Sequence, residues 1–126
     1  MGETGWILYF VALALLVVFI RMRRGGQVSK KQAEDLVKNG AIIVDVRNPD
    51  EFQRGHLSQA YNMPLNDLDS QMRAKFKNPE KPILVHCQSG IRSKRAKKQL
   101  ERAGYKNVYD LGSYERAFRI VSGRSL

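Results

Sequence analysis

A single cysteine lies in a short stretch whose composition suits thiolate chemistry. The stretch reads Val85-His-Cys-Gln-Ser-Gly-Ile-Arg-Ser93, so an apolar run ends, Cys87 follows, and small residues lead into an amphipathic segment. Backbone N–H groups of such a loop, and of a helix that starts after it, point toward the sulfur and stabilise negative charge there. Arg92 is expected to add to that stabilisation. The pattern therefore indicates a nucleophilic cysteine.

Two other interpretations of Cys87, an inert buried cysteine and a zinc ligand, are disfavoured. Most free cysteines are inert, buried and apolar in character, but Gly90, Arg92 and Ser93 around Cys87 argue against that reading. Because Cys87 is the only cysteine, no disulfide within the chain is possible, which fits a reducing compartment or a reactive thiol. His56 with Cys87 is too small a set for zinc, which normally takes four ligands. We therefore predict no metal and no other cofactor.

The elements that must position Cys87 are predicted from apolar periodicity and capping residues. Residues 41–46 and 82–86 form short apolar runs that predict buried strands, the second of which ends at Cys87. A third strand is expected at residues 108–109. Helices are expected after the capping residues Ser29 and Asn48, and over residues 65–76, 93–103 and 114–121. Alternating strands and helices predict an α/β fold, a small and mostly parallel sheet with helices on both faces. Cys87 then lies at the carboxyl end of a parallel strand, where such sheets bind ligands.

Two signatures in the chain resemble those of single-domain rhodaneses. The first is Asp45-Val-Arg-Asn-Pro-Asp-Glu-Phe52 with Gly55-His-Leu57 and Ala60-Tyr-Asn-Met-Pro64, and the second is the loop Cys87–Ser93. Their order and separation match over residues 28–121. The resemblance implies a rhodanese-like fold and transfer of sulfane sulfur, from thiosulfate or a persulfide donor to a thiol or cyanide-like acceptor, through a persulfide on Cys87. The substrate-binding residues that it implies are Gln88, Ser89, Gly90, Ile91, Arg92 and Ser93.

The chain departs from the family pattern near its C-terminus. Gly112-Ser113 stands where the family usually has two glycines, and Phe118 replaces a tryptophan that follows them. This puts in question the shape of the pocket more than the chemistry. Phosphatases and arsenate reductases on the related fold place five residues between cysteine and arginine, whereas four separate Cys87 from Arg92. A non-catalytic binding module is disfavoured because both of these residues are present.

Charged residues near the loop have predicted roles as well. Since successive strand residues point to opposite faces, His86 is expected to pack away from the thiolate. Asp45, Arg47 and Glu51 are expected to form a structural ion-pair network. A basic group follows the loop and either forms a solvated face or attracts anions or lipid headgroups: Lys94, Arg95, Lys97 and Lys98. The net charge of +10 suits anionic partners, and we expect no nucleic acid.

The N-terminal part of the chain is predicted to be a membrane anchor. An unbroken apolar run over residues 6–20, which Thr4 and Gly5 extend to about 17 residues, approaches the length that spans a bilayer, and residues 4–22 are the predicted membrane segment. A cleaved signal peptide is the alternative, but it would need a basic start and a cleavage site with small residues. Arg21, Arg23 and Arg24 follow the run, so the positive-inside rule places the domain in the cytoplasm. The predicted division is residues 1–26, anchor and linker, and residues 27–126, a rhodanese-like domain.

Overall fold

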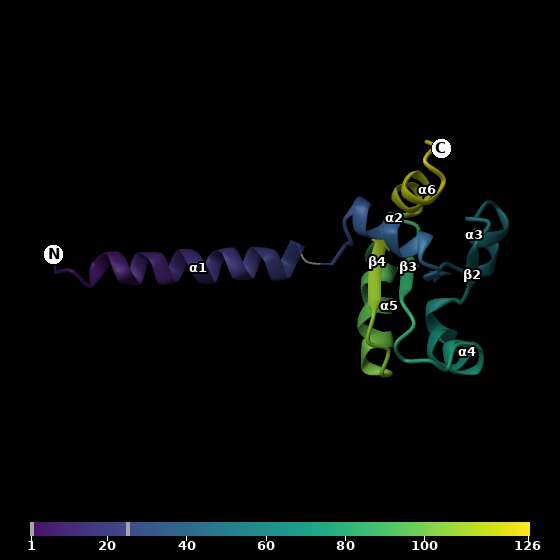
Figure 1. Cartoon of the computed structure of the whole chain (residues 1–126), viewed down its shortest axis with the longest axis horizontal. Coiled ribbons are helices and arrows are strands. Elements are labelled where there is room, and N and C mark those ends of the chain that lie inside the picture. The colour runs from purple at the N-terminus through teal and green to yellow at the C-terminus, as the bar shows by residue number, and fades with distance from the viewer. Residues whose placement is uncertain (1, 25) are drawn as a thin grey trace.

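Four parallel strands form the central sheet of the domain in the computed structural model. The structure describes the backbone of residues 2–24 and 26–126 and the side chains of residues 2–20 and 26–126. The strands lie in the order β2-β1-β3-β4 (Figure 1). Their bounds are Ile42–Asp45 for β1, Ala60–Asn62 for β2, Ile83–His86 for β3 and Val108–Gly112 for β4. The predicted mostly parallel sheet is confirmed.

Helices cover both faces of this sheet, as predicted. The helices α4 (Leu68–Lys75) and α5 (Ile91–Arg102) pack on one face, and α2 (Lys30–Lys38) and α6 (Tyr114–Ser122) pack on the other. Neighbouring residues of a strand supply the two cores in turn, because side chains alternate along a strand. Val44 thus contacts the cluster of α4 and α5, whereas Ile43 contacts that of α2 and α6. Because both faces of the sheet are covered, β1 and β3 consist of apolar residues up to their last positions, Asp45 and His86.

Two of the predicted helix starts, those after Ser29 and Asn48, are confirmed by their hydrogen bonds. Ser29 precedes α2, and its Oγ accepts a hydrogen bond from the backbone N–H of Gln32 at 3.3 Å. Asn48 precedes the short helix α3 (Pro49–Gln53), and its backbone N–H donates to Glu51 Oε1 at 3.1 Å. This capping box fixes the start of α3, the helix that carries Glu51 toward the cysteine loop.

Several elements differ from the prediction, and β4 is longer than the two residues expected, 108–109. The strand β2 was not predicted, because its three residues are exposed or half-buried and form no apolar run. Residues 65–76 divide into a 3₁₀ turn, Leu65–Asp67, and the helix α4. The helix α5 begins at Ile91, two residues before the predicted start, since Gly90 has a left-handed φ of +96° that turns the chain directly into the helix.

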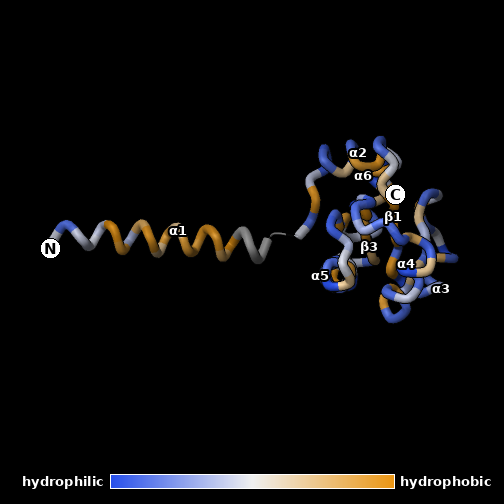
Figure 2. The backbone as a smooth tube through the Cα atoms, turned by 60° about the horizontal axis from the view of Figure 1, so that its bottom comes forward, coloured by the Kyte–Doolittle hydropathy of each residue, from blue (hydrophilic) through white to orange (hydrophobic). Residues whose placement is uncertain are grey.

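The N-terminal helix α1 spans Gly5–Arg24, and its large apolar side chains are exposed. Figure 2 shows that hydrophobic residues occupy much of its length. Over residues 2–20 and 26–126, for which side chains are described, no helix has both the length and the apolar character that crossing a membrane requires. The transmembrane helix predicted over residues 4–22 is therefore not supported. The predictions that concern the side chains of Arg21, Arg23 and Arg24, and the linker residue Gly25, lie outside the described residues.

Candidate functional site

The cysteine loop connects the carboxyl end of β3 to the start of α5. Cys87 directly follows the last residue of β3, and its backbone N–H donates to Gly112 O at 3.1 Å, at the end of the neighbouring strand β4. The side chain of Cys87 is completely buried. The loop therefore lies at the edge of the sheet where parallel strands end and ligands usually bind, as the sequence predicted.

A backbone N–H group points at the sulfur from within the loop. The Gly90 N–H donates to Cys87 Sγ at a distance of 3.0 Å. The left-handed conformation of Gly90 is one that a residue with a Cβ atom rarely adopts, and it directs this N–H back toward the cysteine. A donor held so close favours negative charge on the sulfur. Of the loop residues predicted to bind the sulfur, Gly90 is the one whose contact with it is direct.

Ser93 lies under the loop and supports it from the first turn of α5. Its hydroxyl is buried and donates to Gly90 O at 3.1 Å, and it lies 3.4 Å from Gly112 O. Beneath it, the Asp110 carboxylate accepts a hydrogen bond from the Gly112 N–H at 2.8 Å. Burial raises the pKa of Asp110, and the hydrogen bond from the Gly112 N–H opposes that rise. Ser93 thus positions the loop backbone.

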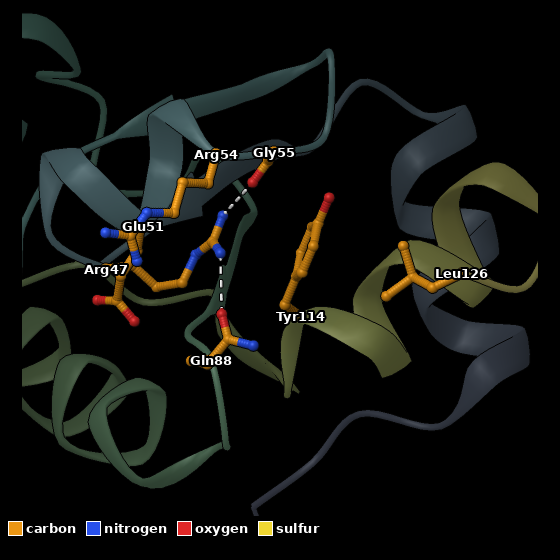
Figure 3. Close-up of a pocket in the computed structure, with 7 residues that line it drawn as sticks. All are labelled: Arg47, Glu51, Arg54, Gly55, Gln88, Tyr114 and Leu126. Atoms are coloured by element: carbon orange, nitrogen blue, oxygen red, sulfur yellow. Dashed lines mark hydrogen bonds between the residues drawn. The ribbon is translucent and has the colours of Figure 1, made fainter.

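Arg47 connects the loop to the end of β1. Its guanidinium donates to Asp45 at 2.8–3.0 Å. It also donates to Gln88 Oε1 at 2.9 Å and to Gly55 O at 2.8 Å (Figure 3). It also lies over the Tyr114 ring, 4.4 Å from the ring centroid. The predicted pair of Asp45 and Arg47 is confirmed, and both side chains are buried. The contact with Gln88 was not predicted, and it fixes the first loop residue after the cysteine.

Arg92 forms a bidentate ion pair with Glu51. The two guanidinium nitrogens lie 2.7 Å and 2.9 Å from the two carboxylate oxygens. The predicted network of Asp45, Arg47 and Glu51 was therefore wrong in its third member, because Glu51 is turned toward α5. The hydrogen bonds from Arg92 lower the pKa of Glu51 to about 2. The role of Arg92 as the anion contact stays a prediction. In this structure both terminal nitrogens of its guanidinium donate to the Glu51 carboxylate.

This ion pair predicts a change in acid stability. The folded pKa of Glu51, about 2, lies below its usual value of 4.5, so its stabilising effect is complete above pH 4.5 and is lost as pH falls toward 2. The free energy of unfolding of the wild type should exceed that of Glu51→Gln at pH 6, and the gap should narrow between pH 4.5 and 2. Urea titrations across that range measure it. Glu101→Gln, in a longer and half-exposed pair with Lys97, is the control and should show little pH-dependent difference.

His86 packs beneath the loop, as predicted. It is completely buried, its Nδ1 lies 3.2 Å from Cys87 O, and its Nε2 lies 3.6 Å from Asp45 Oδ2. Burial lowers the pKa of His86, so the ring is neutral at pH 7. His56 lies elsewhere, stacked on Phe52 with 3.7 Å between ring centroids. Over the described residues, no three His, Cys, Asp or Glu side chains are grouped so that they could hold a metal ion.

Two cavities flank the loop. One, of about 460 Å³, is lined by residues from β1, α3, the loop, α6 and the C-terminus: Arg47, Glu51, Arg54, Gly55, Gln88, Tyr114 and Leu126 (Figure 3). The other, of about 530 Å³, is lined by Gln27, Ser89, Gly90, Ile91, Lys94, Arg95 and Lys98. Lys97, predicted with these basic residues, pairs with Glu101 instead. The loop therefore presents Gln88 to one cavity and Ser89 to Ile91 to the other.

The departures from the family pattern shape the first cavity. Tyr114, which follows Gly112 and Ser113, forms part of its wall. Phe118 packs edge-on against that tyrosine, with 6.1 Å between ring centroids. Gly112-Ser113 and Phe118 were recognisable in the sequence as departures from the family pattern, but Tyr114 and Arg54 were not predicted to belong to the site. Their signal was weak, because neither residue lies within the cysteine loop.

The known proteins that are similar to this chain include rhodaneses and thiosulfate sulfurtransferases. The Rhodanese-like domain family matches residues 29–116. Thiosulfate sulfurtransferase 18 of Arabidopsis thaliana is 40% identical over 97 residues, which cover 68% of this chain and 71% of that protein. Thiosulfate sulfurtransferase GlpE of Coxiella burnetii is 35% identical over 91 residues, covering 71% and 83%. A solved structure of a rhodanese with anions from E. coli has a TM-score of 0.59 at 27% identity and covers 61% of this chain and 91% of that one.

Proposed function

Since the chain belongs to the rhodanese-like family, we propose that it is a sulfurtransferase that carries sulfane sulfur on Cys87. The observation that supports this most directly is the Gly90 N–H at 3.0 Å from Cys87 Sγ, in a loop at the carboxyl end of a parallel strand. Relatives named thiosulfate sulfurtransferase, 35–40% identical to this chain, support thiosulfate as a donor. The donor in this proposal is thiosulfate or a persulfide.

The proposed reaction has two steps. The Cys87 thiolate attacks the outer sulfur of thiosulfate, a Cys87 Sγ–S bond forms, the S–S bond of the donor breaks, and sulfite leaves with the electron pair. A thiol or cyanide-like acceptor then attacks the terminal sulfur of the persulfide, the Sγ–S bond breaks, and the thiolate returns. The Gly90 N–H stabilises the sulfur anion at the start and end of the cycle. Because Cys87 is completely buried, the surrounding side chains must move for the donor to reach it.

The persulfide is the intermediate that tests this function. After incubation with thiosulfate and removal of excess donor, the intact mass of the chain should rise by one sulfur atom. Addition of cyanide should return the original mass, because the acceptor takes that sulfur. A Cys87→Ser chain treated in the same way is the control and should keep its mass. An unchanged wild-type mass would contradict the proposed carrier.

We also propose that α1 tethers the domain to a membrane, with the domain facing the cytoplasm. The helix exposes large apolar side chains, among them Leu8 at 70% and Leu15 at 65%, which are costly to leave in water. In the sequence, Arg21, Arg23 and Arg24 directly follow the apolar run, as the positive-inside rule requires for this orientation.

Cell fractionation tests the tether. The full chain should stay with membranes through an alkaline wash, and Leu15→Arg should release part of it, whereas Gln59→Arg on the domain should not. A reporter that fluoresces only in the cytoplasm, fused after Leu126, should be bright. A freely soluble wild-type chain would contradict the tether, and a dark fusion would contradict the orientation.

A further inference from the structure

The cavity beside Gln88 is lined by charged side chains that could receive an anionic donor. Its volume, about 460 Å³, lies within the range of small-molecule sites. Two guanidinium groups line it, those of Arg47 and Arg54, together with the Glu51 carboxylate. A third guanidinium, that of Arg92, is bound to Glu51. Which of the three can bind an anion depends on the partners that each already has.

The guanidinium of Arg47 already has hydrogen-bond partners on all three of its nitrogens. Its Nε and one terminal nitrogen donate to the Asp45 carboxylate, and its two terminal nitrogens also donate to Gly55 O and Gln88 Oε1. The carboxylate neutralises its charge, and the residue is only 2% exposed. An anion that bound Arg47 would have to displace buried hydrogen bonds, which is costly. Arg47 therefore positions Gln88 and offers little attraction to a donor.

Arg92 is engaged in a similar way. Its two terminal nitrogens donate to the two oxygens of Glu51, the geometry in which a guanidinium binds a carboxylate most strongly. The pair has no net charge. A donor would have to compete with a carboxylate that is already seated in the fork of the arginine.

Arg54 is the guanidinium of this cavity that remains available. Among the described residues its side chain has no ion pair and no hydrogen bond, and it is exposed. It lies at the C-terminal end of α3, directly before Gly55, whose carbonyl oxygen accepts from Arg47 (Figure 3). This attachment holds the base of Arg54 at the cavity wall while its five N–H donors stay free.

We propose that Arg54 binds the anionic end of the sulfur donor in this cavity and so determines the preference for charged donors. The inference rests on the proposed sulfurtransferase function and adds a residue that the cysteine loop does not contain. Arg47 and Arg92 are each neutralised by a carboxylate, so Arg54 is the arginine that lines this cavity without an ion-pair partner among the described residues. Its planar fork matches the oxygens of a sulfonate-like end, which it binds with two parallel hydrogen bonds.

The test compares two arginine variants of the full chain with two donors. Arg54→Gln should raise KM for thiosulfate about three- to tenfold, since an exposed ion pair contributes about 1 kcal/mol. The value of kcat should stay within twofold of the wild type. With a persulfide donor whose organic group carries no charge, KM should stay within twofold. Arg73→Gln is the matched control, because Arg73 is an exposed arginine that lines a separate cavity with Lys77 and Tyr105. It should change neither KM.

Two further results separate this inference from its premise. Arg54→Lys keeps the charge but loses the fork, and it should restore part of the affinity for thiosulfate. An active wild type with an unchanged thiosulfate KM in Arg54→Gln, or with equal losses for both donors, would overturn the assignment of Arg54 alone. A wild type that takes no sulfur from thiosulfate would overturn the proposed function and this assignment together.

Discussion

Replacing Cys87 with serine should abolish sulfur transfer from thiosulfate to cyanide, with a loss of about 10⁴-fold or more, as expected when the nucleophile of a covalent mechanism is removed. Serine keeps nearly the same size and can accept the hydrogen bond from the Gly90 N–H. Its oxygen cannot carry sulfane sulfur as a persulfide, so the first step of the cycle is lost. The fold should not change, since Cys87 belongs to a core that tolerates a side chain of this size.

The measurement is the initial rate of thiocyanate formation by the full-length chain at saturating thiosulfate. Far-UV circular dichroism of the wild type and of Cys87→Ser shows whether the fold is retained. A matched change within the same loop is Ser89→Ala, which removes a hydroxyl next to the second cavity but leaves the sulfur and its donor in place. It should retain most of the activity. Substantial turnover by Cys87→Ser with an unchanged spectrum would exclude Cys87 as the carrier.

The parts of the fold that could be predicted are those encoded by neighbouring residues. The strands β1 and β3 are buried on both faces, so their apolar runs are visible in the sequence. The caps at Ser29 and Asn48 act over three residues and were equally visible. The strand β2 was missed because it is held by pairing with β1 rather than by its own composition. A short strand with exposed residues carries no local signal.

The same distinction applies to the site. The place of Cys87 and the direction of the Gly90 N–H follow from a strand, a glycine and a helix that adjoin in the chain. Two contacts that decide how charge is distributed join residues 41 positions apart, namely Arg92 with Glu51 and Arg47 with Gln88. A single sequence does not indicate which arginine forms an ion pair with which carboxylate when the two are far apart in the chain. Both contacts depend on how the residues in and around α3 are placed against the cysteine loop. Because Glu51 already binds Arg92, the proposed anion contact is Arg54 instead.

The second large effect that we expect is on stability: Asp45→Asn should lower the free energy of unfolding by about 3–5 kcal/mol. The carboxylate of Asp45 is completely buried at the end of β1. It accepts hydrogen bonds from the Arg47 backbone N–H at 3.0 Å and from the Arg47 side chain at 2.8–3.0 Å, and His86 Nε2 lies 3.6 Å away. Removing its charge leaves a buried guanidinium without a counter-ion, which costs far more than the loss of an exposed pair.

Urea titrations of the full-length chain at pH 7, followed by circular dichroism, measure this loss. Asp50→Asn is the matched control, because Asp50 is an exposed carboxylate in the first turn of α3, and its removal should cost no more than about 1 kcal/mol. The double variant Asp45→Asn/Arg47→Met removes both members of the buried pair, so it should recover part of the loss seen in Asp45→Asn. A loss below about 1 kcal/mol in Asp45→Asn would show that water or another group compensates the Arg47 charge. The ion pair would then not be what holds the end of β1 against the cysteine loop.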